Sequence, residues 1–323
     1  MRWLVTGGCG FIGTNLIYKL RLSGVNNIRV VDNLSVGTRE DLSRVTDFEE
    51  ITESDIGTDE YGVELIIGDV LDADLALRVC ADVDVIVHLA ANTGVGPSVE
   101  DPMFDCKVNV IGTVNYLEGA RINKASRFVF ASSGAPAGEV EPPIHEEIVP
   151  KPVSPYGSSK LAGEGYCSSY FRCFGIETVA LRFGNVYGPG SKHKGSVVAK
   201  FINQALAGKS FEIYGDGNQT RDFIFVEDLV CAIVCGATES SIGGEVFQIA
   251  TSKETTVGEL ALLMKEILES KGLNVPEIIY AESRNGDVKR NFSDTTKAYR
   301  RLGWTSETEL RDGLSSTLSF FLD

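Results

Sequence analysis

Apolar residues in the first half of the chain switch between short continuous runs and helical spacing. Short apolar runs bounded by turn residues predict buried strands, and apolar residues three or four positions apart predict helices. The predicted strands are residues 2–6, 28–32, 64–68, 84–88, 127–131 and 177–182, and the predicted helices are residues 11–23, 72–80, 103–123 and 156–174. Because strands and helices alternate, the pattern predicts an α/β fold with a doubly wound parallel sheet. The acidic segment from Thr46 to Tyr61 has no clear period and is expected to be a surface loop.

The second half of the chain has a less regular pattern. The predicted helices there are residues 197–206, 226–235, 257–271, 295–302 and 307–322, with a short strand at 246–250. This half is expected to form a smaller α/β cap over the carboxyl edge of the sheet, where doubly wound folds bind ligands. The chain is expected to return to the main sheet between Arg221 and Ala250, which makes the cap discontinuous. The first domain then comprises residues 1–182 and about 222–250, and the second comprises residues about 183–221 and 251–323.

A glycine-rich turn joins the first predicted strand to the first helix, with the sequence Thr6-Gly-Gly-Cys-Gly-Phe-Ile-Gly13. Glycines let backbone approach backbone, and the free N–H groups at the helix N-terminus make a seat for a pyrophosphate. Asp32, at the end of the second strand, would accept hydrogen bonds from adenosine ribose hydroxyls and repel a 2′-phosphate, which favours NAD over NADP. A glycine turn alone can be only a turn. Here the strand, the glycines, the helix and Asp32 agree, so the first domain is predicted to be a Rossmann-type NAD-binding domain.

The composition is that of an ordinary globular protein with a strong negative charge. Of 323 residues, 43% are apolar and 23% are charged, and 30 basic against 45 acidic side chains give a net charge of −15. This charge argues against nucleic acid or an anionic membrane as a partner, because both need a basic face. No apolar run approaches the length of a membrane span and no signal sequence precedes the first strand, so a cytoplasmic location is expected.

Cysteine and histidine do not form a recognisable metal site. The seven cysteines are scattered, at positions 9, 80, 106, 167, 173, 231 and 235. They form no Cys-x-x-Cys pair and no metal set with the three histidines, so no metal is predicted. Several lie in predicted core elements, which favours buried, reduced thiols. His88, at the end of the fourth strand, is expected to be packed or close to the cofactor rather than to act as a base.

The strongest candidate chemistry lies at the start of the helix predicted for residues 156–174. Tyr156 and Lys160 are four residues apart, which puts both side chains on one face of a helix. A lysine ammonium near a phenol favours the phenolate, so the pKa of Tyr156 is expected to be lowered, and the phenolate could accept a proton from a sugar hydroxyl. Ser133, at the end of the fifth strand, is expected to hydrogen-bond the same substrate oxygen. If this pair is considered without other motifs, the alternative is that Tyr156 and Lys160 are surface residues that share one exposed face of the helix and have no catalytic role.

These features occur together with further motifs, and the whole set resembles one protein family. The motifs are the glycine turn, Gly68-Asp-Val70, His88-Leu-Ala-Ala91, Ser132-Ser133, Tyr156-x-x-x-Lys160, Asn185-Val-Tyr-Gly-Pro189, Gly215-Asp-Gly-Asn-Gln-Thr-Arg-Asp222 and Arg284-Asn-Gly-Asp287. Over essentially its whole length, the chain resembles the extended short-chain dehydrogenase/reductase family, in the NAD-dependent nucleotide-sugar epimerase/dehydratase branch. The resemblance implies NAD as the cofactor, a UDP-sugar as the substrate, and a nucleotide-sugar-binding role for the second domain.

By this resemblance, the cofactor contacts come from the ends of several strands. Asp69 and Val70 would contact the adenine, and Lys160 would hold the hydroxyls of the nicotinamide ribose. Asn109 matches an asparagine of the family's helix that supports the cofactor site. The full set of expected cofactor-binding residues is Gly7, Gly10, Phe11, Ile12, Gly13, Asp32, Asn33, Asp69, Val70, Leu89, Ala90, Ala91, Thr93, Asn109, Tyr156 and Lys160.

The resemblance also assigns residues to the nucleotide sugar. Asn185, Arg221 and Arg284 would grip its diphosphate, and Asp287 would bind its ribose. Arginines present planar donor forks that suit phosphate oxygens, and they supply the local positive charge that an anionic ligand needs on an acidic protein. Asn291 stands at the position that gates the size of the C2 substituent in related 4-epimerases. Its intermediate size leaves both plain hexoses and N-acetylhexosamines open.

The residues that follow Ser133 limit which reactions of the family the chain could catalyse. The 4,6-dehydratases of the family place Asp and Glu there, and the UDP-glucuronate decarboxylases usually carry a Glu at the second place, whereas this chain has Gly134 and Ala135. Because neither residue can transfer a proton, elimination and decarboxylation are disfavoured. With Ser133, Tyr156 and Lys160 as the catalytic set, and Ser133 also binding substrate, the resemblance implies epimerisation at C4 through a transient 4-keto sugar. UDP-glucose and UDP-galactose are the expected pair.

Several alternatives stay open. A 4-epimerase of UDP-glucuronate or of a UDP-N-acetylhexosamine fits the same catalytic set, and a nucleotide-sugar reductase or dehydrogenase would need to release reduced cofactor. A non-catalytic NAD-sensing protein would typically have lost the catalytic tyrosine or lysine. Relatives often dimerise through a four-helix bundle, so a homodimer is expected through the helices predicted for 103–123 and 156–174. Gly163 and Gly165 would let such helices approach closely.

Overall fold

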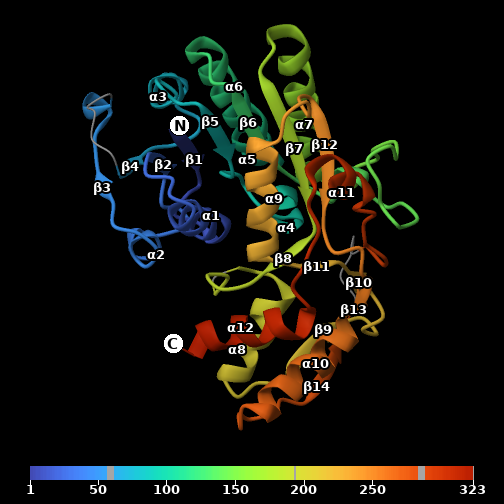
Figure 1. The fold of residues 1–323 in the computed structure, drawn as a ribbon. Helices are drawn as coiled ribbons and strands as arrows, with labels where there is room; N and C mark the ends of the chain where they lie inside the picture. Colours follow the sequence, from blue (N-terminus) through green and yellow to red (C-terminus); the bar gives the residue numbers. More distant parts are fainter. Residues whose placement is uncertain (57–61, 193, 283–287, 323) are drawn as a thin grey trace.

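The structure is a computed structural model that describes residues 1–56, 62–192, 194–282 and 288–322. Its centre is a parallel sheet with the strand order β12-β7-β6-β5-β1-β2-β4-β3 (Figure 1). These strands are β1 Trp3–Thr6, β2 Ile28–Asp32, β3 Glu49–Glu50, β4 Val63–Ile67, β5 Val85–His88, β6 Arg127–Ser133, β7 Glu177–Phe183 and β12 Glu245–Ile249. The strand order reverses between β1 and β5, which confirms the predicted doubly wound α/β fold. Ligands of such sheets bind outside the carboxyl ends of the strands at this reversal.

Helices cover both faces of the sheet. They are α1 Phe11–Leu22, α2 Arg39–Ser43, α3 Ala73–Val79, α4 Val95–Glu100, α5 Pro102–Cys106, α6 Gly112–Asn123, α7 Pro155–Phe174, α8 Val197–Leu206, α9 Val226–Thr238, α10 Val257–Ser270, α11 Thr296–Leu302 and α12 Leu310–Leu322. Successive strand residues point to opposite faces, so Val5 packs with α1 and α9 while Leu4 packs with α3, α6 and α7. The sheet is therefore buried on both sides, as expected for a parallel sheet.

A third buried cluster lies beyond the carboxyl edge of the sheet. It joins α8, α10 and α12, and it includes Phe201, Phe211, Met264 and Leu314 (lower part of Figure 1). Short strands complete this region, namely β8 Asn185–Tyr187 parallel to β11 Phe223–Phe225, β9 Phe211–Tyr214 parallel to β14 Ile278–Ala281, and β10 Thr220–Arg221 antiparallel to β13 Thr255–Thr256. The two-domain boundaries drawn from the sequence remain a proposal.

Some elements differ from the sequence-based prediction. The expected loop at 46–61 contains the edge strand β3 and a 3-10 turn at Glu53–Asp55, while residues 57–61 lie outside the described residues. The helix expected at 103–123 begins at Pro102 and includes a π-helical segment, Lys107–Ile111, between α5 and α6. A strand of two residues is too short to show a hydrophobic period, and a π-helical segment changes the spacing of side chains within a helix. Among the described helices, none combines the length and apolar character needed to span a membrane.

The cysteines are free thiols in all seven positions. Those at 9, 80 and 167 are buried, those at 231 and 235 are half-buried, and those at 106 and 173 are exposed. The expectation of buried, reduced thiols therefore holds for only part of the set. Burial raises the pKa of the Cys9 thiol, which lies in the glycine turn, to about 12. This thiol is neutral at physiological pH and packs as a small apolar side chain.

Candidate active site

At Gly7 and Gly13, the glycine turn between β1 and α1 is packed so closely that no side chain can fit. Gly7 has a φ of +69°, and a Cβ placed there would lie 2.9 Å from the backbone nitrogen of Ala90. A Cβ on Gly13 would lie 2.4 Å from the carbonyl oxygen of Gly7. Gly10 precedes α1 and offers no side-chain cap to the N–H groups of its first turn. The sequence therefore builds a helix N-terminus that a ligand anion can approach at backbone distance.

Asp32 joins the glycine turn to the end of β2 through hydrogen bonds. One carboxylate oxygen accepts from the backbone N–H of Cys9 at 2.9 Å, and the other accepts from the N–H of Leu34 at 2.8 Å. Burial raises the pKa of Asp32, and the two hydrogen bonds oppose this rise. The structure thus places Asp32 beside the glycine turn, where the sequence predicted it.

Two of the residues expected to bind the cofactor, Asn33 and Asp69, contact each other. The amide of Asn33 donates to a carboxylate oxygen of Asp69 at 3.0 Å, which joins the ends of β2 and β4. Val70 is buried, and its side chain would lie 2.8 Å from a Cβ on Gly112. Three of the expected residues after β5, Leu89, Ala90 and Ala91, are half-buried, whereas Thr93 is exposed.

Asn109 connects the loop after β5 to α7. Its side-chain oxygen accepts from the N–H of Asn92 at 2.8 Å. Its amide nitrogen donates to the carbonyl of Asn92 at 3.0 Å and to Oγ of Ser159 at 3.1 Å. Only 1% of Asn109 is exposed, so it supports this loop from within the protein.

Tyr156 and Lys160 lie at the amino end of α7 because Ser154 and Pro155 start the helix there. Ser154 caps it by accepting from the N–H of Gly157 at 3.1 Å, and Pro155 occupies the first turn. Tyr156 and Ser133 lie close enough for the Ser133 hydroxyl to lower the pKa of the Tyr156 phenol, against the rise caused by burial. Lys160 is 3% exposed and donates from Nζ to the carbonyl of Ala131 at 2.8 Å.

The expected lowering of the Tyr156 pKa is wrong for the protein without ligands. Burial raises the pKa of Tyr156 to about 12, and the nearby Ser133 hydroxyl opposes this rise only in part. The Nζ of Lys160 donates to the Ala131 carbonyl and lies 6.0 Å from the centre of the Tyr156 ring. Burial in turn lowers the pKa of Lys160 to about 8. Helical spacing correctly predicted that Tyr156 and Lys160 lie on one face of α7. It did not predict that the pKa of Tyr156 is raised.

His88 is a packed residue, as expected. Its Nδ1 and Oγ1 of Thr6 are 2.9 Å apart, and its ring lies 5.3 Å from that of Tyr116. Complete burial lowers the pKa of His88 to about 3, with a further small contribution from the charge of Lys160. The imidazole is therefore neutral at physiological pH.

Two acidic residues near Lys160 were missed from the sequence. Asp105 on α5 is 0% exposed, and Glu164 follows Lys160 by one helical turn. Glu164 accepts from Nε of Arg182 at 2.8 Å and from its Nη2 at 2.7 Å, which makes a buried fork-shaped ion pair. Asp105 precedes Asn109 by one helical turn, a spacing that could have linked it to the cofactor-side asparagine.

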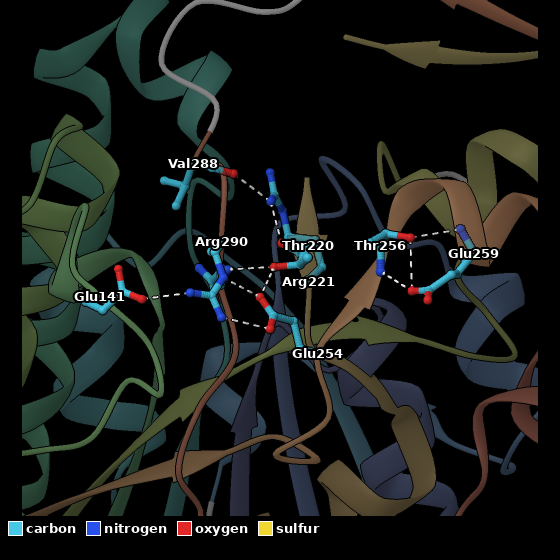
Figure 2. A network of polar contacts seen from close by, with 9 residues as sticks. Glu141, Thr220, Arg221, Glu254, Thr256, Glu259, Val288 and Arg290 are labelled. Carbon is cyan, nitrogen blue, oxygen red and sulfur yellow. Dashed lines mark hydrogen bonds and ion pairs between the residues drawn. The ribbon is translucent and has the colours of Figure 1, made fainter. Parts of the chain in front are cut away.

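The residues expected to bind the nucleotide sugar lie around β8, β10 and the segment after residue 287. Asn185 begins β8, and its N–H donates to the carbonyl of Asp222 at 2.8 Å. Arg221 donates from Nη1 to the carbonyls of Thr220 and Val288, at 2.6 and 2.7 Å (Figure 2). Arg221 therefore links β10 to the segment that begins at Val288. Arg284 and Asp287 lie outside the described residues.

Asn291 lies beside the residues that follow Ser133. Its side-chain amide lies 4.0 Å from the place where a Cβ on Gly134 would stand. The next residues, Ala135–Ala137, form a 3-10 turn. The chain thus brings Asn291 to the loop that the sequence associated with the choice of reaction. Among the described residues, no group of three or more His, Cys, Asp or Glu side chains could hold a metal ion.

Comparison with known proteins places the chain among nucleotide-sugar enzymes. It is 37% identical to the putative UDP-glucose 4-epimerase of Methanocaldococcus jannaschii, over 98% of this chain and 97% of that protein. The structure of the Thermotoga maritima UDP-glucose 4-epimerase with UDP-glucose has a TM-score of 0.89 and 35% identity, and the match covers 100% of this chain and 99% of that chain.

A different sugar appears in another similar structure. The UDP-N-acetylglucosamine 4-epimerase of Methanobrevibacter ruminantium, in complex with UDP-N-acetylmuramic acid, has a TM-score of 0.86 and 29% identity over 99% of this chain and 98% of that chain. The sequence pattern of the NAD dependent epimerase/dehydratase family matches residues 3–250. The chain therefore belongs to the NAD dependent epimerase/dehydratase family.

Proposed function

We propose that this protein is an NAD-dependent nucleotide-sugar 4-epimerase that interconverts UDP-glucose and UDP-galactose. The observation that carries the proposal is that Tyr156 and Ser133 lie together near Lys160, and that Gly134 and Ala135 come directly after Ser133. The pair can move the proton of one hydroxyl. The two residues after it offer no group for the further proton transfers that elimination requires.

The site suits NAD because the turn between β1 and α1 leads into a helix N-terminus whose N–H groups can receive a pyrophosphate. Gly7 and Gly13 leave no room for a Cβ, and the first turn of α1 has no side-chain cap. Asp32 would bind the adenosine ribose, and Asn33 with Asp69 would border the adenine. When bound, NAD supplies a hydride acceptor and donor for C4 of the sugar, and its oxidised ring carries a positive charge that favours a nearby phenolate.

In the proposed reaction, Tyr156 takes the proton of the C4 hydroxyl as the hydride leaves C4, which gives a 4-keto sugar. Ser133 holds the same oxygen through a hydrogen bond. Lys160 keeps a positive charge close to the pair. After the keto sugar has presented its opposite face to the cofactor, Tyr156 would give the proton back to the C4 oxygen. Protons, electrons and cofactor are restored in each cycle.

For the substrate, we propose that Asn185 and Arg221 bind the diphosphate together with Arg284, and that Asp287 binds the ribose. Arg221 is supported by its position in β10, facing the segment that carries Asn291. Asn291 beside Gly134 would border the sugar. Since Asn291 is of intermediate size, a UDP-N-acetylhexosamine is an alternative substrate, as is UDP-glucuronate.

One substrate panel tests this function. Purified protein with NAD is incubated separately with UDP-galactose, UDP-N-acetylglucosamine and UDP-glucuronate, and products are followed by proton NMR. The expected result is UDP-glucose from UDP-galactose without net NADH. A C4 epimer from another substrate would correct the sugar and keep the reaction. Net NADH would favour a dehydrogenase, and no conversion of any substrate would contradict the proposal.

The variant Tyr156→Phe separates catalysis from NAD sensing. We expect turnover to fall by about 10²- to 10⁴-fold, the usual contribution of a general acid–base group. NAD binding, measured by calorimetry, should be retained because the glycine turn and Asp32 are unchanged. Unchanged turnover would contradict the assigned role of Tyr156.

We also propose that the protein forms a homodimer through α5, α6 and α7. Met103, Phe104, Ile111 and Tyr166 expose large apolar surfaces on these helices and the π-helical segment. A Cβ on Gly165 would meet nothing within 4 Å, so this face of α7 lets another helix approach. Light scattering should give the mass of a dimer.

The matched variants are Phe104→Glu and Leu262→Glu. Leu262 is equally apolar and exposed, but it lies on α10, away from the proposed interface. Phe104→Glu should give a monomer because a charge at a helix interface is costly to bury. Leu262→Glu should leave the mass unchanged. A monomeric unmodified protein would contradict the homodimer.

A further inference from the structure

Asp105 is a buried carboxylate that the proposed reaction does not use. Its Oδ1 accepts from the amide of Asn109 at 2.9 Å and from that of Asn92 at 3.4 Å. Its Oδ2 has no hydrogen-bond partner in the described part of the chain. Removing a carboxylate from water without full compensation is costly, so a nearby positive charge is needed to stabilise it.

Lys160 supplies that positive charge. It lies on α7, which packs against the helix of Asp105, and its ammonium is almost completely buried. The described residues include no direct ion pair between the two, so their charges act on each other through the protein interior. The carboxylate of Asp105 opposes the lowering of the Lys160 pKa by burial, and it is the largest of the opposing influences.

The other titratable groups around this lysine are neutral or already paired. On α7, Glu164 is neutralised by the fork of Arg182 and also accepts from Oγ of Ser132 at 2.6 Å. Burial raises the pKa of the Cys167 thiol well above neutral, and burial keeps His88 on β5 uncharged. Asp105 on α5 is therefore the anion near the lysine that no cation pairs directly among the described residues.

A chain of hydrogen bonds also links Asp105 to the backbone of the catalytic tyrosine. The amide of Asn109 bridges Asp105 Oδ1 and Oγ of Ser159, at 2.9 and 3.1 Å. Ser159 Oγ donates in turn to the carbonyl of Tyr156 at 3.1 Å. The carboxylate is thus held in a fixed place relative to the phenol, and its charge opposes formation of the Tyr156 phenolate.

We propose that Asp105 is the buried counter-ion of the Tyr156–Lys160 pair and sets the pH range in which the pair works. It is a positioning residue that acts through the pair. An anion favours the protonated form of each neighbour, so it raises the pKa of both the ammonium and the phenol. Neutralising Asp105 should lower both. The predicted effect on turnover rests on the proposed epimerase function. The predicted effect of Asp105 on the pKa of Lys160 does not, because it requires no substrate.

The first test measures the titration of Lys160 directly. Protein with ¹³C at the lysine ε-carbons is titrated by NMR, and the Lys160 signal is assigned as the one absent from Lys160→Met. The unmodified protein should titrate near pH 8. In Asp105→Asn the midpoint should fall by about one pH unit or more, the effect of losing a nearby opposite charge.

The matched control is Asp101→Asn. Asp101 caps the same helix one turn earlier, is exposed, and can be replaced by asparagine, an equally good cap. It removes the same charge from the same helix, and the Lys160 midpoint should stay unchanged. If Asp105→Asn fails to fold by circular dichroism, Asp105→Ser keeps an acceptor oxygen for Asn109 and repeats the test. An unchanged midpoint in the folded neutral variant would overturn the proposal.

The second test is the pH profile of kcat/KM. In Asp105→Asn both limbs should move to lower pH, because the phenol and the ammonium each lose a proton more easily. If kcat/KM falls at every pH but the acidic and basic limbs of the profile keep their midpoints, Asp105 has only a structural role and the proposal is overturned. If the protein turns over none of the sugars tested, the epimerase proposal fails, and the lysine titration still decides the role of Asp105.

Discussion

Arg290 holds both carboxylate oxygens of Glu254, with Nε 2.8 Å from Oε1 and Nη2 3.0 Å from Oε2 (Figure 2). The same guanidinium donates from Nη1 to Glu141 at 2.7 Å, and Glu254 also accepts from Oγ1 of Thr220 at 2.8 Å. Arg290 therefore ties the segment that carries Asn291 through Glu254 to β10, and directly to Glu141 in the loop that follows residues 135–137.

Replacing Arg290 with glutamine should weaken binding of the nucleotide sugar. The segment that carries Asn291 would lose its ties to Glu141 and Glu254, so KM should rise several-fold while kcat changes less. The thermal midpoint should change little, because exposed ion pairs contribute little to stability. Arg311→Gln is the control, since Arg311 makes an exposed pair with Glu266 on other helices. Equal KM values in the two variants would contradict a role for Arg290.

Glu164→Gln should destabilise the fold strongly. Glu164 and Arg182 are 5% and 3% exposed, so the variant leaves a buried guanidinium without its counter-charge. Breaking such a pair costs about 3–5 kcal/mol. Urea unfolding measures this loss against Glu309→Gln, which breaks the exposed pair with Lys253 and should change the unfolding free energy far less. Similar losses in both variants would show that burial of the first pair does not matter.

Alanine at the two neighbouring glycines of α7 should have opposite effects. A Cβ on Gly163 would lie 2.3 Å from the ring of Phe130, so Gly163→Ala should cost about 1–3 kcal/mol through overpacking. A Cβ on Gly165 would meet nothing within 4 Å in its own chain, so in the monomeric Phe104→Glu variant Gly165→Ala should stabilise the helix by about 0.5–1 kcal/mol. Chemical unfolding with the mass checked by light scattering tests both. A stabilising Gly163→Ala would refute the close packing on Phe130.

The buried imidazole of His88 should make the protein sensitive to acid. Its pKa is about 3 when folded and 6.5 when exposed, so the unfolded chain binds a proton between these values that the folded chain refuses. Stability should therefore fall as the pH drops through this window, by about 1.4 kcal/mol per pH unit.

The measurement compares unfolding free energies at pH 7.5 and pH 5. The drop should be about 2 kcal/mol smaller in His88→Asn than in the unmodified protein, since the asparagine does not titrate. His145→Asn, at an exposed histidine, should keep the full drop. An identical drop in the His88 variant would contradict the buried, neutral state of this imidazole.

The parts of the site that local spacing determines were predictable from the sequence. The glycine turn and Asp32 lie together because strand, turn and helix are continuous in the chain, and Asp32 reaches Cys9 across one parallel strand pair. The shared face of Tyr156 and Lys160 follows from helical spacing. In both cases the residues proposed to act together are close in the sequence or on neighbouring elements.

What the sequence did not reveal depends on burial and on contacts between distant segments. The pKa of Tyr156 rises because packing around α7 removes the phenol from water, which spacing alone does not show. Gly163 was expected to serve helix pairing, but it gives room to the Phe130 ring of β6. Asp105 escaped notice because its importance arises only when α5 packs against α7.

The third buried cluster has a consequence for synthesis on the ribosome. Tyr187 of β8 and Phe201 of α8 are covered in part by Leu314, Leu318 and other residues of α12, more than a hundred positions later in the chain. Those early residues emerge while their covering helix has not yet been translated. The nascent polypeptide must therefore carry this apolar surface exposed while the residues between α8 and α12 are added, about a third of its elongation, and a chaperone that shields such surface can act on the region during that time.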